Sequence, residues 1–489
     1  MSGAHQAATG QAPVLTAAAL AAARLEPPFP FALLLDDGSR LDLLRPLRIL
    51  PGKRIVAEGI RNGQRVLAKL FIAPGNARHW RRERDGLALL AAADIPTTPI
   101  IAAGAIAAGG HYLLTAFLPD ARSLASELEN TGDDDGGNAR AWLETLCTRL
   151  GQLHARGIAH GDPHPGNILL HAGDPLLIDG DAVRQRPAPL SGGQADAMLA
   201  CLLAGLPPEK TLAPLIAAYH AGNPRHTPSP TALQAQIDKY RRARLTDYLA
   251  KTVRPCTRFD VRRTTRRFVA VGRSDAASLA PLLDDPDRAM AAGVLLKDGR
   301  TATVARVEVD GRMLAVKRYN IKNAAHALSR AWRPSRAWHA WREGHRLHFL
   351  GIDTPMPRAL IEERLGPLRR RAWLITDYHG GCSLAEHLAP CIDAAAPPPA
   401  ESEALIRLFA TLHAHRIAHG DLKANNLLWD EARGIAVIDL DAMTQYTCAA
   451  AHARAWRRDR ARLLANWPEE SGLHRWLDAH LPGACRSCS

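Results

Sequence analysis

The chain has 489 residues, of which 47% are hydrophobic and 23% charged, the composition of an ordinary globular protein. This length exceeds what one hydrophobic core supports, so we expect at least two domains. No apolar run approaches the ~20 residues that span a bilayer. The first residues also lack the basic leader of a secretory signal, and we therefore expect a cytoplasmic protein.

The net charge of +13 is unevenly distributed along the chain. Residues 1–250 hold 25 Lys and Arg against 23 Asp and Glu, whereas residues 251–489 hold 37 against 26. A basic half predicts an anionic partner such as phosphate or anionic lipid. A GC-rich genome, which gives proteins rich in arginine and alanine, would also explain these counts, and both interpretations remain open.

The eight cysteines are scattered, which indicates reduced thiols. Cys485 and Cys488 form a single CxxC pair at the C-terminus. A zinc site needs about four ligands, so one pair favours a frayed tail over a metal site.

The first half predicts a small sheet followed by helices. Residues 1–25 are rich in alanine and indicate a flexible terminus or a loosely docked helix. Residues 45–71 alternate as antiparallel strands around a turn at Asn62-Gly63. The order continues with a helix around 78–92, a strand at 111–117, a helix over 139–157 and further helices in 190–250.

The second half repeats this order. Residues 256–273 alternate like a hairpin and are assigned to the start of the second domain. Strands are then predicted within 293–319, a helix within 325–350 and a strand at 372–378, with helices after it. We place the domains at 26–250 and 251–489.

A motif occurs twice in this arrangement. AHGDPHPGNI at 159–168 recurs as AHGDLKANNL at 418–427, and each copy precedes an apolar strand that ends in acidic residues. Asp162 and Asp421 are 259 residues apart. The acidic strand ends, LLIDGD and AVIDLD, repeat with a spacing of 260. The matching register indicates an internal duplication.

These residue types are those of phosphoryl-transfer enzymes, in which catalysis is mainly positioning and charge neutralisation. An Asp orients the acceptor hydroxyl, an Asn and a second Asp bind Mg²⁺, and a strand Lys neutralises the phosphates of ATP. The second copy supplies Asp421, Asn426, Asp439 and Lys317, with Lys423 at the transferred phosphate. The first copy supplies Asp162, Asn167, Asp179 and Lys69, with His164 where the second has Lys423.

The fold predicted from this order is α+β. It consists of two tandem protein-kinase-like domains, each with a small antiparallel β N-lobe and a helical C-lobe. Gly161 and Gly420 precede the catalytic Asp where regulated protein kinases carry Arg. Their presence favours a phosphotransferase for small molecules or glycans that needs no activation.

The phosphate-covering loop and the helix glutamate are less evenly duplicated. Gly299 and Thr301 lie between two predicted strands and can present backbone N–H groups to phosphates. The first copy offers only Pro51-Gly52-Lys53. The glutamate that pairs with the strand Lys is predicted at Glu83 in the first copy and at Glu343 in the second. Asp181 and Asp441 either add a metal ligand or cap the following loop.

An insertion distinguishes the second copy. Residues 326–343 interleave arginines and tryptophans between the strand Lys and the helix. Arginine for phosphate and tryptophan for an interface would suit an anionic membrane surface. Packing of the tryptophans onto the N-lobe is the alternative.

The motifs KDGRTATVARVEVDGRMLAVKRYN, GIDTPMP, HGDLKANNLLW and VIDLD resemble the lipopolysaccharide core kinase family (Kdo/heptose kinase, InaA/WaaP-like). The likeness covers roughly residues 285–465. The first half, with HGDPHPGNILL, is more similar to aminoglycoside phosphotransferases of the same superfamily. The resemblance implies ATP- and Mg²⁺-dependent phosphorylation of heptose or Kdo hydroxyls of the lipopolysaccharide inner core. It also implies a Gram-negative cell and the cytoplasmic face of its inner membrane.

Two other functions remain open at this point. A pseudokinase pair could bind nucleotide and regulate envelope assembly, but both copies keep Lys, Asp, Asn and Asp. A small-molecule or protein kinase of aminoglycoside-phosphotransferase type would need an acidic acceptor pocket. Nucleic acid is not an expected partner, because the basic residues accompany no recognised binding module.

Overall fold

The computed structural model describes residues 12–130, 136–206, 212–320, 334–366 and 368–482. Within it the chain forms two compact units, Met1–Arg244 and Leu245–Ser489. In each unit antiparallel sheets precede a mostly helical part, which confirms the predicted α+β class. Cys485 and Cys488 lie outside the described residues.

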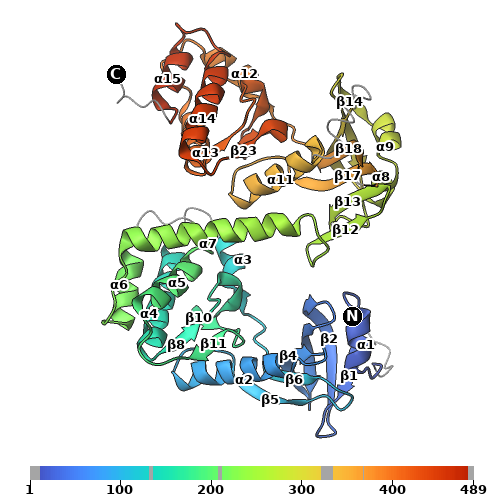
Figure 1. Ribbon diagram of the computed structural model, residues 1–489, viewed down its shortest axis with the longest axis vertical. Coiled ribbons are helices and arrows are strands. Elements are labelled where there is room, and N and C mark those ends of the chain that lie inside the picture. The colour runs from blue at the N-terminus through green and yellow to red at the C-terminus, as the bar shows by residue number, and fades with distance from the viewer. Residues whose placement is uncertain (1–11, 131–135, 207–211, 321–333, 367, 483–489) are drawn as a thin grey trace, which may run out of the picture. The chain divides into compact units, whose positions relative to one another are not determined.

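The first unit begins with a six-stranded antiparallel sheet in the order β1-β2-β3-β4-β6-β5 (Figure 1). Leu113 and Leu114 alternate along β6 and enter two different cores. One core contains helix α1 (Ala17–Ala23), and the other contains helix α2 (Ala77–Ala92). The strands are β1 (Phe31–Leu34), β2 (Arg40–Leu50), β3 (Arg54–Arg61), β4 (Gln64–Phe71), β5 (Ile100–Ala105) and β6 (His111–Ala116).

Helix α1 agrees with the docked-helix alternative for the described part of the alanine-rich N-terminus. Alanine is the strongest helix former, and the Thr16 side chain caps the helix by accepting from the Ala19 N–H at 3.2 Å. Leu20 is fully buried in the core beside β1. Burial of one leucine contributes about 1.5–3 kcal/mol to folding stability. The alanine content alone does not reveal this contribution.

The helical part of the first unit carries the first motif. Its small sheets have the orders β10-β9-β7 and β11-β8. The helices are α3 (Leu124–Asn130), α4 (Gly136–Ala155), α5 (Gly192–Leu203), α6 (Ala213–Gly222) and α7 (Pro230–Lys251), which crosses the division between the units. The short elements are β7 (Arg122–Ser123), β8 (Ile158–His160), η2 (Pro165–Asn167), β9 (Ile168–His171), β10 (Asp174–Leu177) and β11 (Val183–Gln185).

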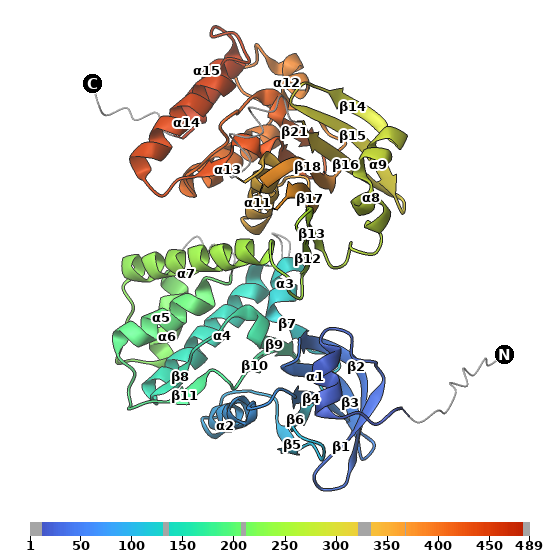
Figure 2. The same ribbon diagram turned by 45° about the vertical axis from the view of Figure 1, so that its right-hand side comes forward.

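The second unit has a seven-stranded antiparallel sheet in the order β12-β13-β17-β18-β16-β15-β14 (Figure 2). Helix α11 (Arg336–Phe349) packs in the core of one face. Helices α8 (Ala280–Asp284) and α9 (Pro286–Ala292) pack in the core of the other. The strands are β12 (Phe259–Arg263), β13 (Arg267–Gly272), β14 (Val294–Asp298), β15 (Ala302–Val309), β16 (Arg312–Tyr319), β17 (Pro357–Leu365) and β18 (Leu368–Asp377).

The helical part of the second unit repeats that of the first. Its small sheets have the orders β19-β21-β22 and β20-β23. Its helices are α12 (Leu384–His387), α13 (Pro399–Ala414), α14 (Ala449–Leu464) and α15 (Gly472–His480), with turns η3 (Ala389–Cys391), η4 (Ala424–Asn426) and η5 (Leu440–Ala442). The strands are β19 (Cys382–Ser383), β20 (Ile417–Ala418), β21 (Leu427–Asp430), β22 (Gly434–Val437) and β23 (Thr444–Gln445).

The duplication extends to strand connectivity. β2-β3-β4-β6-β5 in the first unit has the same connectivity as β14-β15-β16-β18-β17 in the second. The additional strands extend opposite edges: β1 lies beside β2, whereas β13 and β12 lie beside β17. The shared five-stranded core positions the strand lysine in both units, and the edges are where the copies differ.

The tryptophans of the insertion pack onto the sheet where the structure describes them. Trp341 is fully buried, and the Trp338 ring lies 4.8 Å from the Phe268 ring. The packing interpretation is therefore confirmed for these two side chains. Arg330, Trp332 and Arg333 lie outside the described residues. No described helix is both long and apolar enough to cross a membrane.

Candidate active sites

Hydrogen bonds within the catalytic loop of the second unit bring three predicted site residues close together. The Asn426 side-chain amide donates to the Asp421 carbonyl at 2.8 Å. The backbone N–H of Ile438 donates to the Asn426 carbonyl at 2.9 Å, and His419 Nε2 contacts the Ile438 carbonyl at 2.9 Å. Asp439 follows Ile438 directly, so the loop brings Asp421, Asn426 and Asp439 to one place.

Gly420 has a backbone reason to be glycine. Its φ is +80°, and a Cβ there would lie 2.6 Å from the Ala442 carbonyl oxygen. Only glycine adopts this left-handed conformation without strain. Gly161, its counterpart, has no positive φ, and a Cβ would meet its nearest atom at 3.4 Å. In the second unit, backbone geometry alone accounts for the missing arginine.

Two residues of α14 that the sequence analysis missed complete this loop. The buried Asp459 carboxylate accepts from the Gly420 N–H with both oxygens at 3.0 Å. Arg462 donates to the Gly420 carbonyl at 2.6 Å and lies 3.3 Å from the Asp421 carboxylate. Lys423 Nζ lies 3.1 Å from the same carboxylate. Asp421 is therefore held beside two cations.

The strand lysine of the second unit is held by aspartates of the strand-end motif. Lys317 Nζ donates to Asp439 at 2.6 Å and to Asp441 at 3.0 Å. Burial opposes ionisation of Asp439, but the charge and hydrogen bond of Lys317, together with nearby positive charge including that of Arg336, outweigh it and lower the pKa of Asp439. Glu343 instead forms its ion pair with Arg346 at 2.7 Å. The predicted pairing of Lys317 with Glu343 is therefore wrong.

Hydrogen bonds at the ends of α2 and α11 show why Glu343 is not the equivalent residue. Ile95 and Ile352 each donate their backbone N–H to the carbonyl five residues earlier. This match sets the offset between the two helices at 257 residues, and it places Ala340 at the position of Glu83. An alanine cannot form an ion pair with a lysine, so α11 supplies no acidic partner for Lys317 at this position.

Asp441 accepts three donors in the second unit. Its Oδ1 accepts from the Tyr319 hydroxyl at 2.6 Å, and its Oδ2 accepts from Lys317 at 3.0 Å and from Arg336 at 2.5 Å. Burial, reinforced by the Asp441 carboxylate, raises the pKa of Tyr319 well above its usual range. Both oxygens of Asp441 are occupied, which favours an anchoring role over that of a metal ligand.

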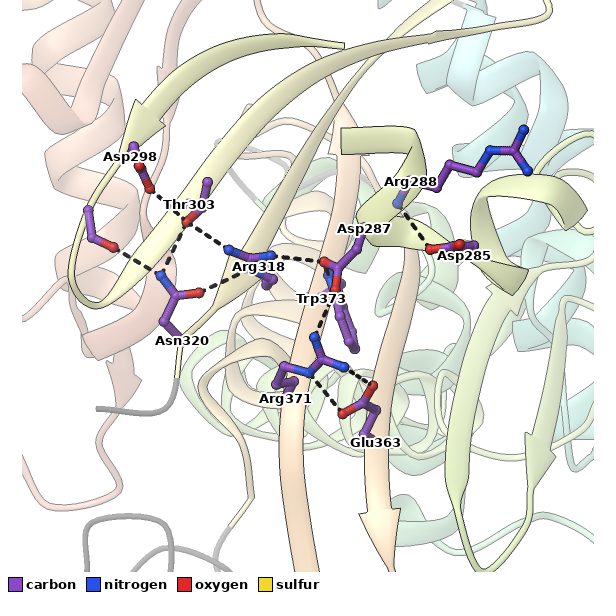
Figure 3. A network of polar contacts seen from close by, with 11 residues as sticks. Asp285, Asp287, Arg288, Asp298, Thr303, Arg318, Asn320, Glu363, Arg371 and Trp373 are labelled. Carbon is purple, nitrogen blue, oxygen red and sulfur yellow. Dashed lines mark hydrogen bonds and ion pairs between the residues drawn. The ribbon is translucent and has the colours of Figure 1, made fainter. Parts of the chain in front are cut away.

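The phosphate-covering loop is anchored to β16. Gly299 and Thr301 lie between β14 and β15, as predicted. The Asn320 side chain donates to the Gly299 carbonyl at 3.0 Å, and its backbone N–H donates to the Thr301 carbonyl at 3.1 Å. Figure 3 shows Asn320 joined to Thr303 and Arg318 as well. Asn320 directly follows the last residue of β16 and stands three residues after Lys317, so one segment of chain positions both the lysine and the loop.

A cavity of about 460 Å³ lies in the second unit beside these groups. The sheet and the helical part both contribute apolar walls, which suits a flat aromatic ring. Its polar lining includes the predicted lysine, metal-site and loop residues. The apolar side chains are Val304, Ala315, Leu374, Leu428 and Ile438, and the polar ones include Thr301, Lys317, Arg336, Asn426, Asp439 and Asp441.

The first unit keeps the lysine–glutamate pair. Lys69 Nζ contacts the Glu83 carboxylate and donates to the Ile178 carbonyl at 2.9 Å. Glu83 is fully buried and accepts from the backbone N–H groups of Gly180 at 3.3 Å and Asp181 at 3.2 Å. The glutamate therefore joins β4, α2 and the strand-end motif.

Charges around Asp179 keep it ionised. Burial raises the pKa of Glu83 and would raise that of Asp179 as well. A hydrogen bond with Glu83 and the charges of Lys69 and Arg54 instead lower the pKa of Asp179 to about 2. An ionised carboxylate is the form that a hard cation binds.

The catalytic loop of the first unit makes the same hydrogen bond from its Asn to its Asp, but a histidine takes the place of the lysine. Asn167 donates to the Asp162 carbonyl at 3.1 Å, as Asn426 does to Asp421. His164 Nε2 lies 3.6 Å from the Asp162 carboxylate. Burial lowers the pKa of His164, so this side chain carries less charge at neutral pH than a lysine.

The donor sets fit Mg²⁺. Among the described residues no three His, Cys, Asp or Glu side chains gather closely enough to hold a metal ion alone. Mg²⁺ usually takes one or two protein oxygens and completes its shell with water and phosphate oxygens. One Asp and one Asn in each unit, Asp179 with Asn167 and Asp439 with Asn426, match that requirement.

Comparison with known proteins identifies the family. The profile of the lipopolysaccharide kinase (Kdo/WaaP) family matches residues 65–189 and 292–467, more than half of the chain. The chain belongs to this family. Each matched segment contains a strand lysine, a catalytic loop and a strand-end aspartate, so both copies carry the family pattern. The protein is therefore a kinase, and the family implies ATP as phosphoryl donor.

A solved kinase is also similar to this chain. The kinase domain of PknI from Mycobacterium tuberculosis, crystallised as a double mutant, has 18% sequence identity and a TM-score of 0.28. The match covers 41% of this lipopolysaccharide-kinase-family chain and 95% of that domain. No curated protein matches the chain.

Proposed function

We propose that the second unit transfers the γ-phosphoryl group of ATP to a heptose or Kdo hydroxyl of the lipopolysaccharide inner core. The observation that carries this proposal is the cavity lined by Lys317, Asn426 and Asp439 in a chain of the lipopolysaccharide kinase family. Asp421 is tied to Asn426 at the edge of this site by the 2.8 Å hydrogen bond.

Each side chain has a role that follows from its position. Val304 and Ala315 from the sheet and Leu428 from the helical part form an apolar slot for the adenine ring. Lys317 neutralises phosphate charge, and Asn426 with Asp439 would hold Mg²⁺. Bound Mg·ATP supplies the phosphoryl group. Asp421 orients the acceptor hydroxyl and accepts its proton, while Lys423 and Arg462 offset negative charge beside it.

The cations beside Asp421 favour an anionic acceptor. Lys423 and Arg462 lie 3.1 and 3.3 Å from its carboxylate. An aminoglycoside is a polycation and would be repelled there, whereas a phosphorylated or acidic core sugar would be attracted. This arrangement supports the glycolipid acceptor over the aminoglycoside-type alternative.

We propose a lesser catalytic role for the first unit. Its Lys69 pairs with Glu83, and the pKa of Asp179 is lowered beside them, which supports nucleotide binding. His164 stands where the second unit has Lys423, and its lowered pKa leaves it mostly neutral. The first unit therefore binds nucleotide and contributes less turnover than the second.

The acceptor sets the place of action. A lipopolysaccharide precursor carries its sugars on a lipid anchor, so the enzyme works at the cytoplasmic face of the inner membrane as a peripheral protein. The proposal includes no nucleic-acid partner.

Mass spectrometry of core oligosaccharide tests this function directly. Cells that lack the protein should lose a core phosphate, and the purified protein with Mg·ATP should restore it on the isolated precursor. An unchanged core together with no transfer in vitro would contradict the proposal. ATP binding without transfer to any core sugar would favour the pseudokinase alternative.

A further inference from the structure

Two neighbouring hairpin tips, at one end of the strands of the second unit's sheet, carry a dense group of arginines. The turns of the β12–β13 and β17–β18 hairpins are joined by a backbone hydrogen bond from the Arg364 N–H to the Arg266 carbonyl at 2.7 Å. Segments 260–267 and 362–371 together contain eight arginines and three acidic residues. The described residues of these two segments are called the arginine tip below.

Internal ion pairs account for only part of this charge. Figure 3 shows Arg371 between Glu363, at 2.8 Å, and Asp287, at 2.9 Å. The other acidic residues of the tip are engaged in the same way: buried Glu362 by Arg364 and Arg369, and Asp260 by Arg262.

Three exposed arginines of the tip have no acidic partner among the described residues. Arg263, Arg266 and Arg370 form none of the ion pairs found there. The undescribed segments of the second unit contain no Asp or Glu that could neutralise them. Burial lowers the pKa of Arg369; the charge of Glu362 opposes this shift, and the charges of Arg364 and Arg263 add to it. The tip therefore holds uncompensated positive charge.

An exposed leucine stands at the end of the second hairpin. Leu365 is 64% exposed, the highest value among the large hydrophobic side chains of the described chain. The aromatic rings near the tip face inward: Phe268 is buried beneath Arg263, and Trp338 lies under Arg369. Stacking of nucleic-acid bases uses exposed aromatic rings, and the tip offers an aliphatic side chain in their place.

We propose that the arginine tip docks on an anionic membrane surface, with its unpaired guanidinium groups at lipid phosphates and Leu365 in the interfacial layer. Guanidinium groups bind phosphate oxygens in a bidentate manner, and an aliphatic side chain beside basic residues suits the interface between head groups and acyl chains. The inference rests on the proposed function only in that a lipid-anchored acceptor gives the docking a purpose.

Vesicle co-sedimentation of the full chain tests the docking. The probes are vesicles of phosphatidylcholine alone and of equal parts phosphatidylcholine and phosphatidylglycerol. The wild-type protein should bind only the anionic vesicles, and less at high salt. A basic residue at such a surface contributes about five-fold to binding, so Arg266→Ala with Arg370→Ala should lower the partition coefficient about 25-fold. Leu365→Ser should lower binding while its salt dependence persists.

A matched control removes two arginines elsewhere. Arg457 and Arg458 are exposed on α14, so changing both to Ala alters the net charge equally and should leave vesicle binding within about two-fold if the tip is the docking surface. Equal loss in both double variants, or no loss in the tip variant, would overturn the proposal. Tip-dependent binding to single-stranded DNA without binding to vesicles would also overturn it.

The assay separates docking from catalysis. Sedimentation needs no phosphoryl transfer, and ATP affinity of the tip variants should equal that of the wild type. Transfer to a core oligosaccharide cut free of its lipid should persist in these variants. If the wild-type protein transferred no phosphate to this free oligosaccharide, the proposed function would be contradicted, whereas the sedimentation result would still decide the docking proposal.

Discussion

Asp441 and Glu83 anchor the strand lysine of their units from different elements. In the first unit the anchor is Glu83 on α2, and in the second it is Asp441 on the strand-end motif, because Ala340 occupies the helix position. Arg336 at the start of α11 completes the cluster through Asp441. An acid at either place keeps the ammonium group of the lysine beside the strand-end motif.

Asp441→Asn should show whether Asp441 or the glutamate predicted from the sequence, Glu343, anchors Lys317. Loss of the charge should lower the rate of phosphoryl transfer about 10- to 100-fold, since a hydrogen bond to a charged group contributes about 1.5–3 kcal/mol. Glu343→Gln serves as the control and should leave transfer nearly unchanged, because Glu343 pairs with Arg346. Steady-state kinetics well below the melting temperature compare the two. The reverse order of effects would restore Glu343 as the partner of Lys317.

Asp439→Asn should weaken binding of Mg·ATP while binding of metal-free ATP changes little. A neutral amide replaces a charged oxygen ligand for a hard cation, and the lowered pKa of Asp439 keeps that ligand ionised in the wild type. Titration calorimetry with and without Mg²⁺ measures both affinities. Unchanged Mg²⁺ dependence would remove Asp439 from the metal site.

At the scale of elements, α2 packs against the strand-end motif of the first unit through two glycines. A Cβ on Gly86 would lie 2.0 Å from the Gly180 carbonyl oxygen. This close approach lets Glu83, one turn earlier, reach the backbone N–H groups of Gly180 and Asp181. The contact fixes the helix in the position that the lysine–glutamate pair requires.

Gly86→Ala should therefore destabilise the first unit in spite of alanine's higher helix propensity. Overpacking of this kind costs about 1–3 kcal/mol, and the melting temperature should fall. Gly193→Ala in α5 is the control, because a Cβ there meets nothing within 4 Å and should raise stability by up to about 1 kcal/mol. Equal effects of the two substitutions in thermal melts would argue against the close contact.

The sequence predicts the elements of the repeated core well and the connections between them less well. Strands β4 and β16, helix α2 and the loop at Gly299 occur where alternation and turn residues place them. Spacing alone could not show that Ala340 replaces the helix glutamate in the second copy, because the two helices align only through hydrogen bonds at their C-terminal ends. Asp459 and Arg462 were missed because their partner is the backbone of Gly420.

At the scale of the whole molecule, buried neutral histidines occur in both units. Burial lowers the pKa of His154 to about 3 and that of His160 to about 4 in the first unit, and that of His345 to about 3 in the second. The unfolded chain binds a proton at each near pH 6.5, which the folded chain does not. The stability that these groups contribute is fully present above that value and is lost as the pH falls towards and through the folded values.

Folding stability should therefore decline between pH 6.5 and pH 5 by about 1.4 kcal/mol per pH unit for each histidine. Urea unfolding at several pH values measures the slope. His345→Gln should flatten the slope of the second unit, since an amide does not titrate. A slope that is flat over this range would contradict the buried neutral state.

The most direct test of the account compares the two catalytic aspartates in one assay of Mg·ATP-dependent transfer to the core acceptor. Asp421→Ala should lower the rate at least ~100-fold, the lower range for loss of a general base, while the chain remains folded by circular dichroism. Asp162→Ala should keep most of the wild-type product. Full loss of product with Asp162→Ala, together with near-normal turnover of Asp421→Ala, would place the main catalytic site in the first unit instead of the second.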